Sequence, residues 1–447
     1  MLTSDQKMKI NEKVQGFKEA ADFYRMEYSQ DLMGMFRDFG CMLLEACGIN
    51  AEGDPEIKQL FGYRQVLRGT VKRQLTVIAE ELAGLWKAPV SGEMFQTALS
   101  GIFDFCLYSK GGKNRYLLPV EIAKPLLGLV TRPEGMLSPG EGETVLDTQC
   151  GAGSTLMTAC KYLKNPKLMG YELDEELWAA GIIISRLSDL KMELHLQEEI
   201  PASLYETCDL VISNPVYGTD TIKDDSLAEE LPSELRTVRG RYHLELIRGM
   251  LALKYDGKAM LIVPNSFLFA NRTESIKVRK WLLQSYSLEA VIALPEDTFL
   301  YSGVRSSVMI FSKPFMSSGW EGHTQRVLYY SLEKQEDKEK QKQEYERLEE
   351  VWSQRDSYYG KWEHCRREKT VENRNGIKVP ANWQYNSFWF AGAAGIEAAK
   401  WNLLPENYGP EEQINLEIED PALLLQEMLR EQEEITKELK ELLKEVG

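Results

Sequence analysis

The stretch VLDTQCGAGS, residues 145–154, joins an aliphatic run to a turn that contains two glycines. The aliphatic residues predict a buried strand, and glycine allows positive φ and a close approach of the backbone to a ligand. In open α/β sheets, ligands bind at the carboxyl ends of the strands, where this turn would lie. A dinucleotide-binding fingerprint would need a third glycine at position 156, which is Leu156. The stretch alone is therefore compatible with a cofactor loop and with a simple tight turn.

Short apolar runs alternate with helical stretches between residues 111 and 332. Seven of them are strand-like, namely ETVLD, KLMGYE, MELHL, DLVIS, KAMLIV, LEAVIAL and RSSVMIFS. This alternation predicts a Rossmann-like α/β fold that is doubly wound around a mostly parallel, seven-stranded sheet. Only EDTFLYSGV separates the last two runs, which is too short for a helical crossover. We therefore expect the sheet to end in an antiparallel pair.

Helical segments are expected on both sides of this region. Residues 1–110 show helical periodicity, as in DLMGMFRDFGCMLLEACGI, and predict a helical N-terminal domain that ends at the turn-rich joint SKGGKN. Residues 333–447 are charged and predict a helical extension. Its last helix has Gln432 as the one polar seam residue among heptad positions that are otherwise apolar, at Leu425, Met428, Ile435, Leu439, Leu442 and Val446. Such a narrow stripe predicts either a partner helix or packing onto the chain's own domain.

The composition limits the possible functions. The chain has 447 residues, and 53 Lys+Arg against 69 Asp+Glu give a net charge of −16. Because neutralising phosphates is the main source of affinity for nucleic acids, we expect the chain alone to bind DNA or RNA poorly and to need a basic partner. No apolar run approaches the ~20 residues that a membrane span needs, and the N-terminal residues are too charged for a signal peptide. We expect a soluble, cytoplasmic protein.

The seven cysteines and four histidines do not form a familiar catalytic or metal-binding pattern. The sequence has no CxxC pair and no HExxH motif. We therefore expect reduced, mostly buried thiols and no metal site. Metal-dependent hydrolysis and Ser–His catalysis are not expected.

An acidic residue ends the strand-like run that follows the glycine turn. Glu172 lies 19 residues after Gly153, about the spacing at which the next strand of a Rossmann unit presents a carboxylate to ribose hydroxyls. A glutamate at a strand end is often only a solvated side chain. Together with the glycine turn, Glu172 favours a cofactor that contains a nucleoside.

The run DLVIS leads directly into NPVYG, residues 214–218. Asn214 offers a side-chain carbonyl and Pro215 a main-chain carbonyl, so that the two could accept both hydrogens of an amino group. The ring of Tyr217 could stack on a flat heterocycle lifted out of a duplex. The two acceptors would draw the lone pair of the amine out of conjugation and towards a methyl donor, which is catalysis by positioning and hydrogen bonding. A lone Asn-Pro pair can also be an ordinary turn.

The order of these motifs resembles a known enzyme family. DxxCGxG, an acidic strand end and NPxY follow one another as in amino-group DNA methyltransferases that use S-adenosylmethionine. The stretch from KAMLIVPNSFLF to LEAVIALPEDTFLYSGVRSSVMIFSK looks like the modification subunit of type I restriction systems. The resemblance covers about residues 112–332, near half of the chain, and the flanks are similar only in being helical and heptad-like.

The resemblance implies a function and a set of partners. The chain would methylate the N6 amino group of adenine in DNA, with S-adenosyl-L-methionine as cofactor. It would act as a modification subunit, binding DNA in a complex with a separate specificity subunit and, in some systems, a restriction subunit. The residues after 332 contain no basic, aromatic-rich module that could distinguish bases, which agrees with this division of labour.

The resemblance also assigns residues by position. The adenine-binding motif falls on Asn214, Pro215 and Tyr217. The cofactor loop and the ribose-binding acid fall on Asp147, Cys150, Gly151, Gly153 and Glu172. The acid that faces the adenine of the cofactor could be Glu198, with Glu199 nearly as good, and the upstream element that closes over the methionine would span Tyr116 to Pro119. The chain departs from the family pattern at Leu118, where a threonine is usual, and at Val216, which replaces the second proline of NPPY.

The sequence leaves two other functions open. Enzymes that methylate a glutamine side-chain amide in proteins use a similar NPPY motif. The departures at Leu118 and Val216 would also fit an inactive scaffold that only binds the cofactor. The long helical flanks and the LPEDTF segment favour DNA as the substrate.

Overall fold

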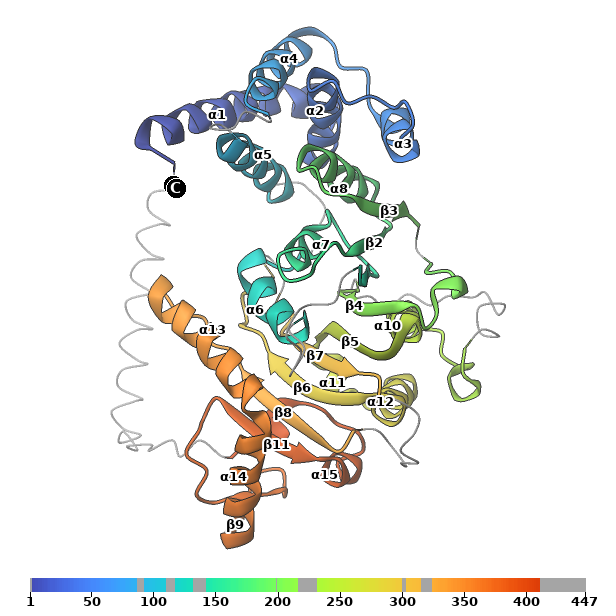
Figure 1. Ribbon diagram of the computed structural model, residues 1–447, viewed down its shortest axis with the longest axis vertical. Coiled ribbons are helices and arrows are strands. Elements are labelled where there is room, and N and C mark those ends of the chain that lie inside the picture. Colours follow the sequence, from blue (N-terminus) through green and yellow to red (C-terminus); the bar gives the residue numbers. More distant parts are fainter. Residues whose placement is uncertain are drawn as a thin grey trace, which may run out of the picture. The chain divides into compact units, whose positions relative to one another are not determined.

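The computed structural model describes residues 2–86, 92–109, 117–131, 142–197, 199–215, 231–299, 303–314 and 324–410. The chain divides into two compact units, residues 1–409 and 410–447. All the helices and strands given below belong to the first unit (Figure 1). The heptad helix predicted for the end of the chain lies outside the described residues, as do Tyr116, Glu198, Val216 and Tyr217.

The chain begins with five helices, which are α1 Ser4–Glu27, α2 Leu32–Ala46, α3 Pro55–Tyr63, α4 Gly69–Ala83 and α5 Gly92–Leu107. Polar side chains cap the first three helices: Thr3 and Gln6 form a capping box at α1, the Asp31 side chain caps α2, and the Asp54 side chain caps α3. The apolar faces of the helices meet in a core that includes an edge-to-face pair of Phe17 and Phe39. The helices predicted for this region are confirmed.

A nine-stranded sheet follows, in the order β11-β8-β6-β7-β5-β4-β1-β2-β3. Seven of its strands are those predicted from the sequence: β1 Thr144–Asp147, β2 Lys167–Glu172, β3 Met192–Leu196, β4 Cys208–Ser213, β5 Leu253–Pro264, β6 Ser287–Ala293 and β7 Ser306–Ser312. Strand β7 runs antiparallel to both β5 and β6, whereas β1 to β5 are parallel to their neighbours in this block. The mostly parallel sheet and the antiparallel pairing of the last two predicted strands are confirmed.

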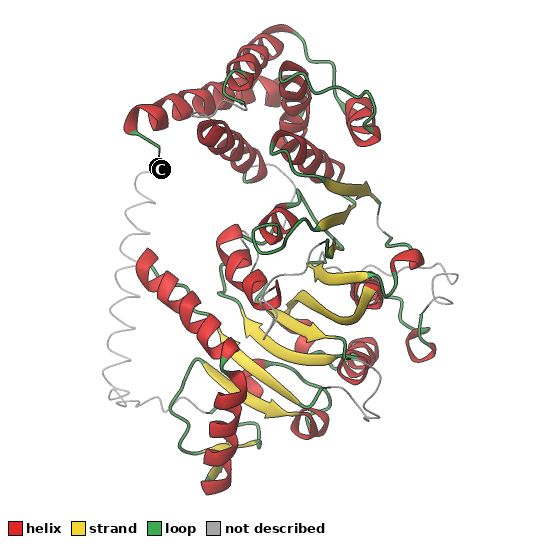
Figure 2. Ribbon diagram, viewed as in Figure 1, coloured by secondary structure: helices red, strands yellow, loops and turns green. Residues whose placement is uncertain are grey.

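Helices connect the strands and cover both faces of the sheet (Figures 1 and 2). They are α6 Val120–Thr131, α7 Ser154–Ala159, α8 Glu175–Leu187, α10 Arg241–Ala252, α11 Asn265–Phe269 and α12 Thr273–Ser285. Because crossovers between parallel strands are right-handed, α7 and α8 lie on one face and α10 and α12 on the other. The part of the chain that the structure describes has no helix long and apolar enough to cross a membrane.

Two strands extend the sheet beyond the predicted seven. Strand β8, Arg326–Ser331, is parallel to β6, and β11, Phe388–Gly392, is antiparallel to β8. The antiparallel pair of β6 and β7 therefore lies inside the sheet and not at its end. Charged helices do follow residue 332, as α13 Lys338–Ser353 and α14 Arg355–Glu368. The expectation of helices alone after this residue was wrong for β11 and for the short hairpin of β9 Thr370–Glu372 and β10 Lys378–Pro380.

An aromatic cluster explains the position of β11. Phe390 packs against Trp362 of α14, and Phe388 packs against Trp383, with ring centroids 6.3 and 5.6 Å apart. Burying several large rings between α14 and the sheet contributes a large apolar area. The sequence segment FWFAG is short and follows a long charged stretch, which is why composition alone pointed to helix.

The helical region packs directly on helix α8, beside strands β2 and β3. Helix α2 lies against α8, and a side chain at Gly40 would collide with Ile183. The guanidinium of Arg186 in α8 forms an ion pair of 2.7 Å with Asp54. The indole N–H of Trp86 donates to the carbonyl of Leu187 at 2.9 Å. These contacts fix α8, which begins just after the predicted ribose-binding acid.

Candidate functional site

The carboxyl ends of four neighbouring strands form one edge of the sheet. Strand β1 pairs in parallel with both β2 and β4, with Asp147 level with Gly170 and with Ile212. Strand β4 pairs in parallel with β5, so that Ser213 is level with Leu261. The segments that follow these strands are therefore brought to the same edge, and they include most of the residues singled out in the sequence.

The glycine turn adopts the backbone conformation that its composition predicts. Gly151 and Gly153 have φ of 54° and 76°, in the left-handed region that glycine tolerates best. A Cβ at position 151 would collide with the side chain of Leu117, and one at 153 would come within 2.9 Å of Met192 Cε. Leu117 belongs to the YLLP segment, so this segment lies against the glycine turn. A side chain at either position would therefore meet both a strained backbone conformation and a neighbouring side chain that has to move.

Glu172 connects the end of β2 to the glycine turn. Its Oε2 accepts a hydrogen bond of 2.8 Å from the N–H of Gly151, and its Oε1 accepts from Leu173 N–H at 2.8 Å and from Asp174 N–H at 2.7 Å. A carboxylate has about four acceptor positions, so one position, on Oε2, is left for a ligand. Burial raises the pKa of Glu172, whereas the three N–H groups act in the opposite direction by stabilising the carboxylate.

Leu173 is a residue that the sequence analysis missed. Its side chain is 55% exposed although it is large and apolar, and it stands directly after Glu172 at the same edge. An exposed apolar side chain beside a polar group is a common feature of a ligand site. The sequence shows that Leu173 follows Glu172, but it does not show that the Leu173 side chain is exposed.

Asp147 is almost completely buried, with 2% of its surface exposed. Its Oδ1 accepts a hydrogen bond of 3.2 Å from the N–H of Gln149. Burial raises the pKa of Asp147 to about 7, and the negative charge of Glu172 adds to this rise. The Asp147 side chain thus supports the start of the glycine turn from the protein interior.

The Cys150 side chain also points into the protein. Its Sγ would lie 2.7 Å from a Cβ at Gly170, so it packs on β2, and its burial raises the thiol pKa. The N–H of Cys150 donates to the carbonyl of Tyr171 at 2.9 Å, and its carbonyl accepts from Gly153 N–H at 2.8 Å. In this conformation Cys150 positions the turn between β1 and β2. All seven cysteines are free thiols, as expected.

Asn214 and Pro215 follow β4 without an intervening residue, with Asn214 half-buried and Pro215 buried. The strand end is tied to the glycine turn by Thr148, whose hydroxyl donates to the Ser213 hydroxyl at 2.7 Å and whose N–H donates to the Ile212 carbonyl at 3.0 Å. Both hydroxyls are buried, so this link is shielded from water. The hydrogen bond between Thr148 and Ser213 therefore joins the segment of the predicted cofactor loop to the strand that precedes the predicted amine-binding pair, Asn214 and Pro215.

The remaining predicted residues have different positions. Pro119 precedes α6, and its carbonyl accepts from Ala123 N–H at 2.9 Å. Leu118, which replaces the usual threonine, is buried with 4% exposed. Glu199 forms an ion pair of 3.5 Å with the buried guanidinium of Arg248. Glu198, to which the resemblance assigns the acid of this segment, lies outside the described residues.

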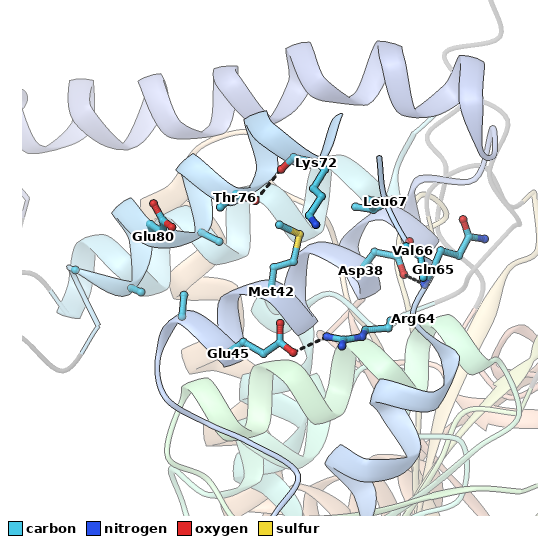
Figure 3. A pocket seen from close by; sticks show the side chains of 14 residues that line it. Asp38, Met42, Glu45, Arg64, Gln65, Val66, Leu67, Lys72, Thr76 and Glu80 are labelled. Atoms are coloured by element: carbon cyan, nitrogen blue, oxygen red, sulfur yellow. Dashed lines mark hydrogen bonds and ion pairs between the residues drawn. The ribbon is translucent and has the colours of Figure 1, made fainter. Parts of the chain in front are cut away.

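A cavity of about 840 Å³ lies elsewhere, between α2, α4 and residues 64–67 of the helical region (Figure 3). Charged and polar side chains line much of it, among them Asp38, Glu45, Arg64, Lys72 and Glu80. An ion pair between Arg64 and Glu45 spans part of its wall (Figure 3). None of the residues predicted for the site lines this cavity. Within the described ranges, no group of three or more side chains could hold a metal ion.

Comparisons with known proteins agree with this arrangement. The family model described as N-6 DNA Methylase matches residues 102–408. The methylase subunit of the type I restriction enzyme EcoEI from Escherichia coli is 23% identical over 284 residues, which are 58% of this chain and 54% of that protein. The methylase subunit of MjaVII from Methanocaldococcus jannaschii is 24% identical over 269 residues, 55% of this chain and 45% of the relative. The chain thus spans about half the length of these curated relatives.

Solved structures show the same fold. The methyltransferase subunit of a type I restriction-modification system from Streptococcus thermophilus superposes with a TM-score of 0.63 at 17% identity, covering 90% of this chain and 100% of the other. A modification subunit of a putative type I restriction enzyme from Vibrio vulnificus gives a TM-score of 0.57 at 17% identity, covering 78% and 72%. At such low identity the likeness concerns the fold.

Proposed function

The chain belongs to the N-6 DNA methylase family, and from this premise we propose that it methylates the N6 amino group of adenine in DNA with S-adenosyl-L-methionine. The observation that carries the proposal is the hydrogen bond between Thr148 and Ser213. It joins the turn predicted to hold the cofactor to the strand that leads into Asn214 and Pro215. A methyl donor and an amine acceptor held at these two segments would share one edge of the sheet.

The residues at this edge fit the cofactor. The two glycines let the turn adopt left-handed backbone conformations, and the side chains of Leu117 and Met192 pack against it. The remaining acceptor position of Glu172 suits a ribose hydroxyl, and the exposed side chain of Leu173 offers an apolar surface to a purine ring. We propose that Asp147, Cys150 and Gly151 shape the turn, and that Tyr116, Pro119 and Glu198 complete the site.

Asn214 and Pro215 would act on the target amine. We propose that the Asn214 side-chain carbonyl and the Pro215 main-chain carbonyl each accept one hydrogen of the adenine N6 amino group. This would weaken the conjugation of the nitrogen lone pair with the ring and aim it away from the two acceptors. S-adenosylmethionine would supply the electrophilic methyl group. Tyr217 would stack on the adenine after it leaves the duplex, a contact worth ~1 to 3 kcal/mol per base.

Val216 and Leu118 differ from the usual family residues without removing these groups. The acceptor carbonyl belongs to Pro215, so valine at 216 gives up only the restriction of φ. Leucine at 118 cannot donate a hydrogen bond to the cofactor, but its buried side chain adds to the hydrophobic core. We therefore propose an active enzyme over an inactive scaffold. The family match gives no support to the alternative in which a protein glutamine is methylated.

The chain would need a partner to act on specific DNA. Its net charge of −16 opposes contact with phosphates. Two of its curated relatives are named as methylase subunits of type I restriction enzymes. We propose that a separate specificity subunit selects the DNA sequence and that a restriction subunit can join the same complex.

The test combines the purified chain with the products of neighbouring genes, tritium-labelled S-adenosylmethionine and DNA. Transfer of label to DNA, and detection of N6-methyladenine after nuclease digestion, is the expected result. Label on a protein glutamine would support the glutamine alternative. Cofactor binding by the chain, measured by calorimetry, with no transfer from any complex would support the scaffold.

A further inference from the structure

We propose that the side-chain amide of Asn265 donates a hydrogen bond to a ring nitrogen of the target adenine, and that this contact selects and positions the base. The acceptor would be N1 or N7, the two ring nitrogens on either side of the amino group. The inference deepens the proposed function, on which it rests, by adding a donor to the two acceptors assigned to Asn214 and Pro215.

Strand β5 extends beyond its neighbour β4 at the carboxyl edge of the sheet. The last paired residues of these parallel strands are Ser213 and Leu261, whereas β5 stays paired with β7 as far as Pro264. Asn214 lies one residue beyond this last pair on its strand, and Asn265 lies four residues beyond it on the other. With a rise of about 3.3 Å per residue, the two asparagines are then separated by roughly 10 Å along the strand direction. Side chains at such a separation can contact the same base.

Two hydrogen bonds to the segment at the start of β7 fix Asn265. Its main-chain N–H donates to the Arg305 carbonyl at 2.8 Å, and its side-chain Oδ1 accepts from the Ser307 hydroxyl at 2.8 Å. Ser307 is completely buried, whereas Asn265 is half-buried. Because the hydroxyl occupies the amide oxygen, the NH₂ group is the end of the amide that is left for a ligand. Within the described part of the chain, no acceptor contacts this NH₂ group.

A buried guanidinium holds helix α11, which begins at Asn265 and follows β5 (Figure 1). Arg279 of α12 is completely buried and donates to the carbonyls of Phe267 at 2.6 Å and of Ala270 at 2.9 Å. Its Nε donates to the carbonyl of Trp401 at 2.7 Å. These bonds supply partners to carbonyls near the end of the short helix, which lack partners within it. The Asn265 amide is therefore ordered before a base arrives, which lowers the entropic cost of binding.

The Asn265 NH₂ group complements the two acceptors proposed for the target amine. Adenine has an amino group between two acceptor nitrogens, N1 on its Watson–Crick edge and N7 on its major-groove edge. Two acceptors and one donor in the protein match this pattern. Guanine and thymine carry an N–H beside a carbonyl on the Watson–Crick edge, so that the same protein groups would face groups of their own kind. The arrangement thus favours adenine through hydrogen bonding as well as through stacking.

The test measures methyl transfer by the complex of the chain with its specificity subunit, after the target adenine has been located by mapping N6-methyladenine. The substrates are DNA duplexes in which this adenine is kept, or is replaced by 1-deazaadenine or 7-deazaadenine, each of which lacks one ring nitrogen. The unmodified chain is compared with Asn265→Ala and with Asn265→Asp, which keeps an oxygen for Ser307 but replaces the donor by an acceptor. The control Asn271→Asp adds the same charge at an exposed asparagine just before α12.

With unmodified DNA, kcat/KM should fall about tenfold for Asn265→Ala and further for Asn265→Asp, while the S-adenosylmethionine Kd and the melting temperature stay the same. The analogues give the sharper comparison. The analogue that lacks the accepting nitrogen should slow the unmodified chain about tenfold but should slow Asn265→Ala no further, because the contact is already lost. This result with 7-deazaadenine identifies N7 as the acceptor, and with 1-deazaadenine it identifies N1.

The proposal would be overturned if Asn265→Ala methylated adenine as fast as the unmodified chain. It would also be overturned if each analogue slowed both proteins by the same factor, since Asn265 would then act only structurally, through Ser307. Equal effects of Asn265→Asp and Asn271→Asp would contradict it as well, because only the added charge would matter. In these three cases the unmodified complex still methylates adenine, so the proposed function stands. Absence of methyl transfer to adenine by the unmodified complex would contradict the proposed function, and this inference with it.

Discussion

The main-chain N–H of Gly151 and the carboxylate of Glu172 form a hydrogen bond of 2.8 Å between the loop after β1 and the end of β2. The bond holds the glycine turn in its left-handed conformation and leaves one acceptor position of the carboxylate open. The turn and the acid are thus one structural unit, although 21 residues separate them in the chain.

Replacing Glu172 by Gln should weaken S-adenosylmethionine binding. An amide accepts only at its oxygen, so its NH₂ group would face either the Gly151 N–H or the N–H groups of Leu173 and Asp174, all of which need an acceptor. Hydrogen bonds to a charged group contribute about 1.5 to 3 kcal/mol, which corresponds to a roughly 10- to 100-fold increase in Kd. Calorimetry measures the change, with Glu176→Gln in the first turn of α8 as the control. Equal affinities for the two variants would remove Glu172 from the site.

Replacing Gly151 by Ala should weaken cofactor binding by a larger free energy than the loss in the free energy of unfolding. The residue has φ of 54° and a Cβ would collide with Leu117. Gly142 is a matched control because it has φ of 78° and no heavy atom within 4 Å of the Cβ position. Gly142→Ala should therefore show only the backbone cost of about 1 to 2 kcal/mol. If the two variants bind S-adenosylmethionine equally well, the close packing at 151 has no functional role.

Replacing Asp147 by Asn should stabilise the protein above pH 7. Burial raises the pKa of Asp147 to about 7, so the folded state binds this proton more tightly than the unfolded state, in which the carboxyl has its ordinary pKa near 4. The free energy of unfolding should then fall as the pH rises from about 4 to 7, and the variant should lack this part of the fall. One pKa unit corresponds to about 1.4 kcal/mol. Urea denaturation at several pH values measures the effect, and parallel curves for both proteins would contradict it.

Replacing Thr148 by Val should lower both stability and methyl transfer. It removes the donor to the Ser213 hydroxyl and leaves a buried group with one partner fewer, at a cost of about 1 to 3 kcal/mol. The control is Thr131→Val, which removes a buried hydrogen bond to the Leu127 carbonyl in α6. Both variants should lose stability, but only Thr148→Val should lower kcat in the complex. The same loss of kcat in both would show that the effect is one of stability alone.

Much of this arrangement followed from local sequence patterns. Seven strands were recognised because each is a short aliphatic run, and the positive φ of Gly151 and Gly153 follows from glycine at the end of a strand. Strand β11 was missed because a five-residue aromatic run gives little periodicity inside a charged region. Its position depends on rings from α14, which only tertiary packing brings together.

Contacts between distant segments were beyond local patterns. The sequence did not reveal that Leu117 covers Gly151 or that the Cys150 side chain turns towards Gly170. It also did not reveal that Glu199 forms an ion pair with Arg248. Each of these contacts forms between residues that only folding brings together. A single sequence does not show which residues will pair in this way.

The central claim is that Asn214 holds the target amine and not the cofactor. The most direct measurement compares Asn214→Ala with the unmodified chain in the methylating complex, for both kcat and S-adenosylmethionine Kd. Loss of one acceptor that acts in the transition state costs roughly 3 kcal/mol. We predict that kcat falls about a hundredfold while the Kd changes by less than about twofold. An unchanged rate of adenine methylation by the Asn214→Ala complex would contradict the claim.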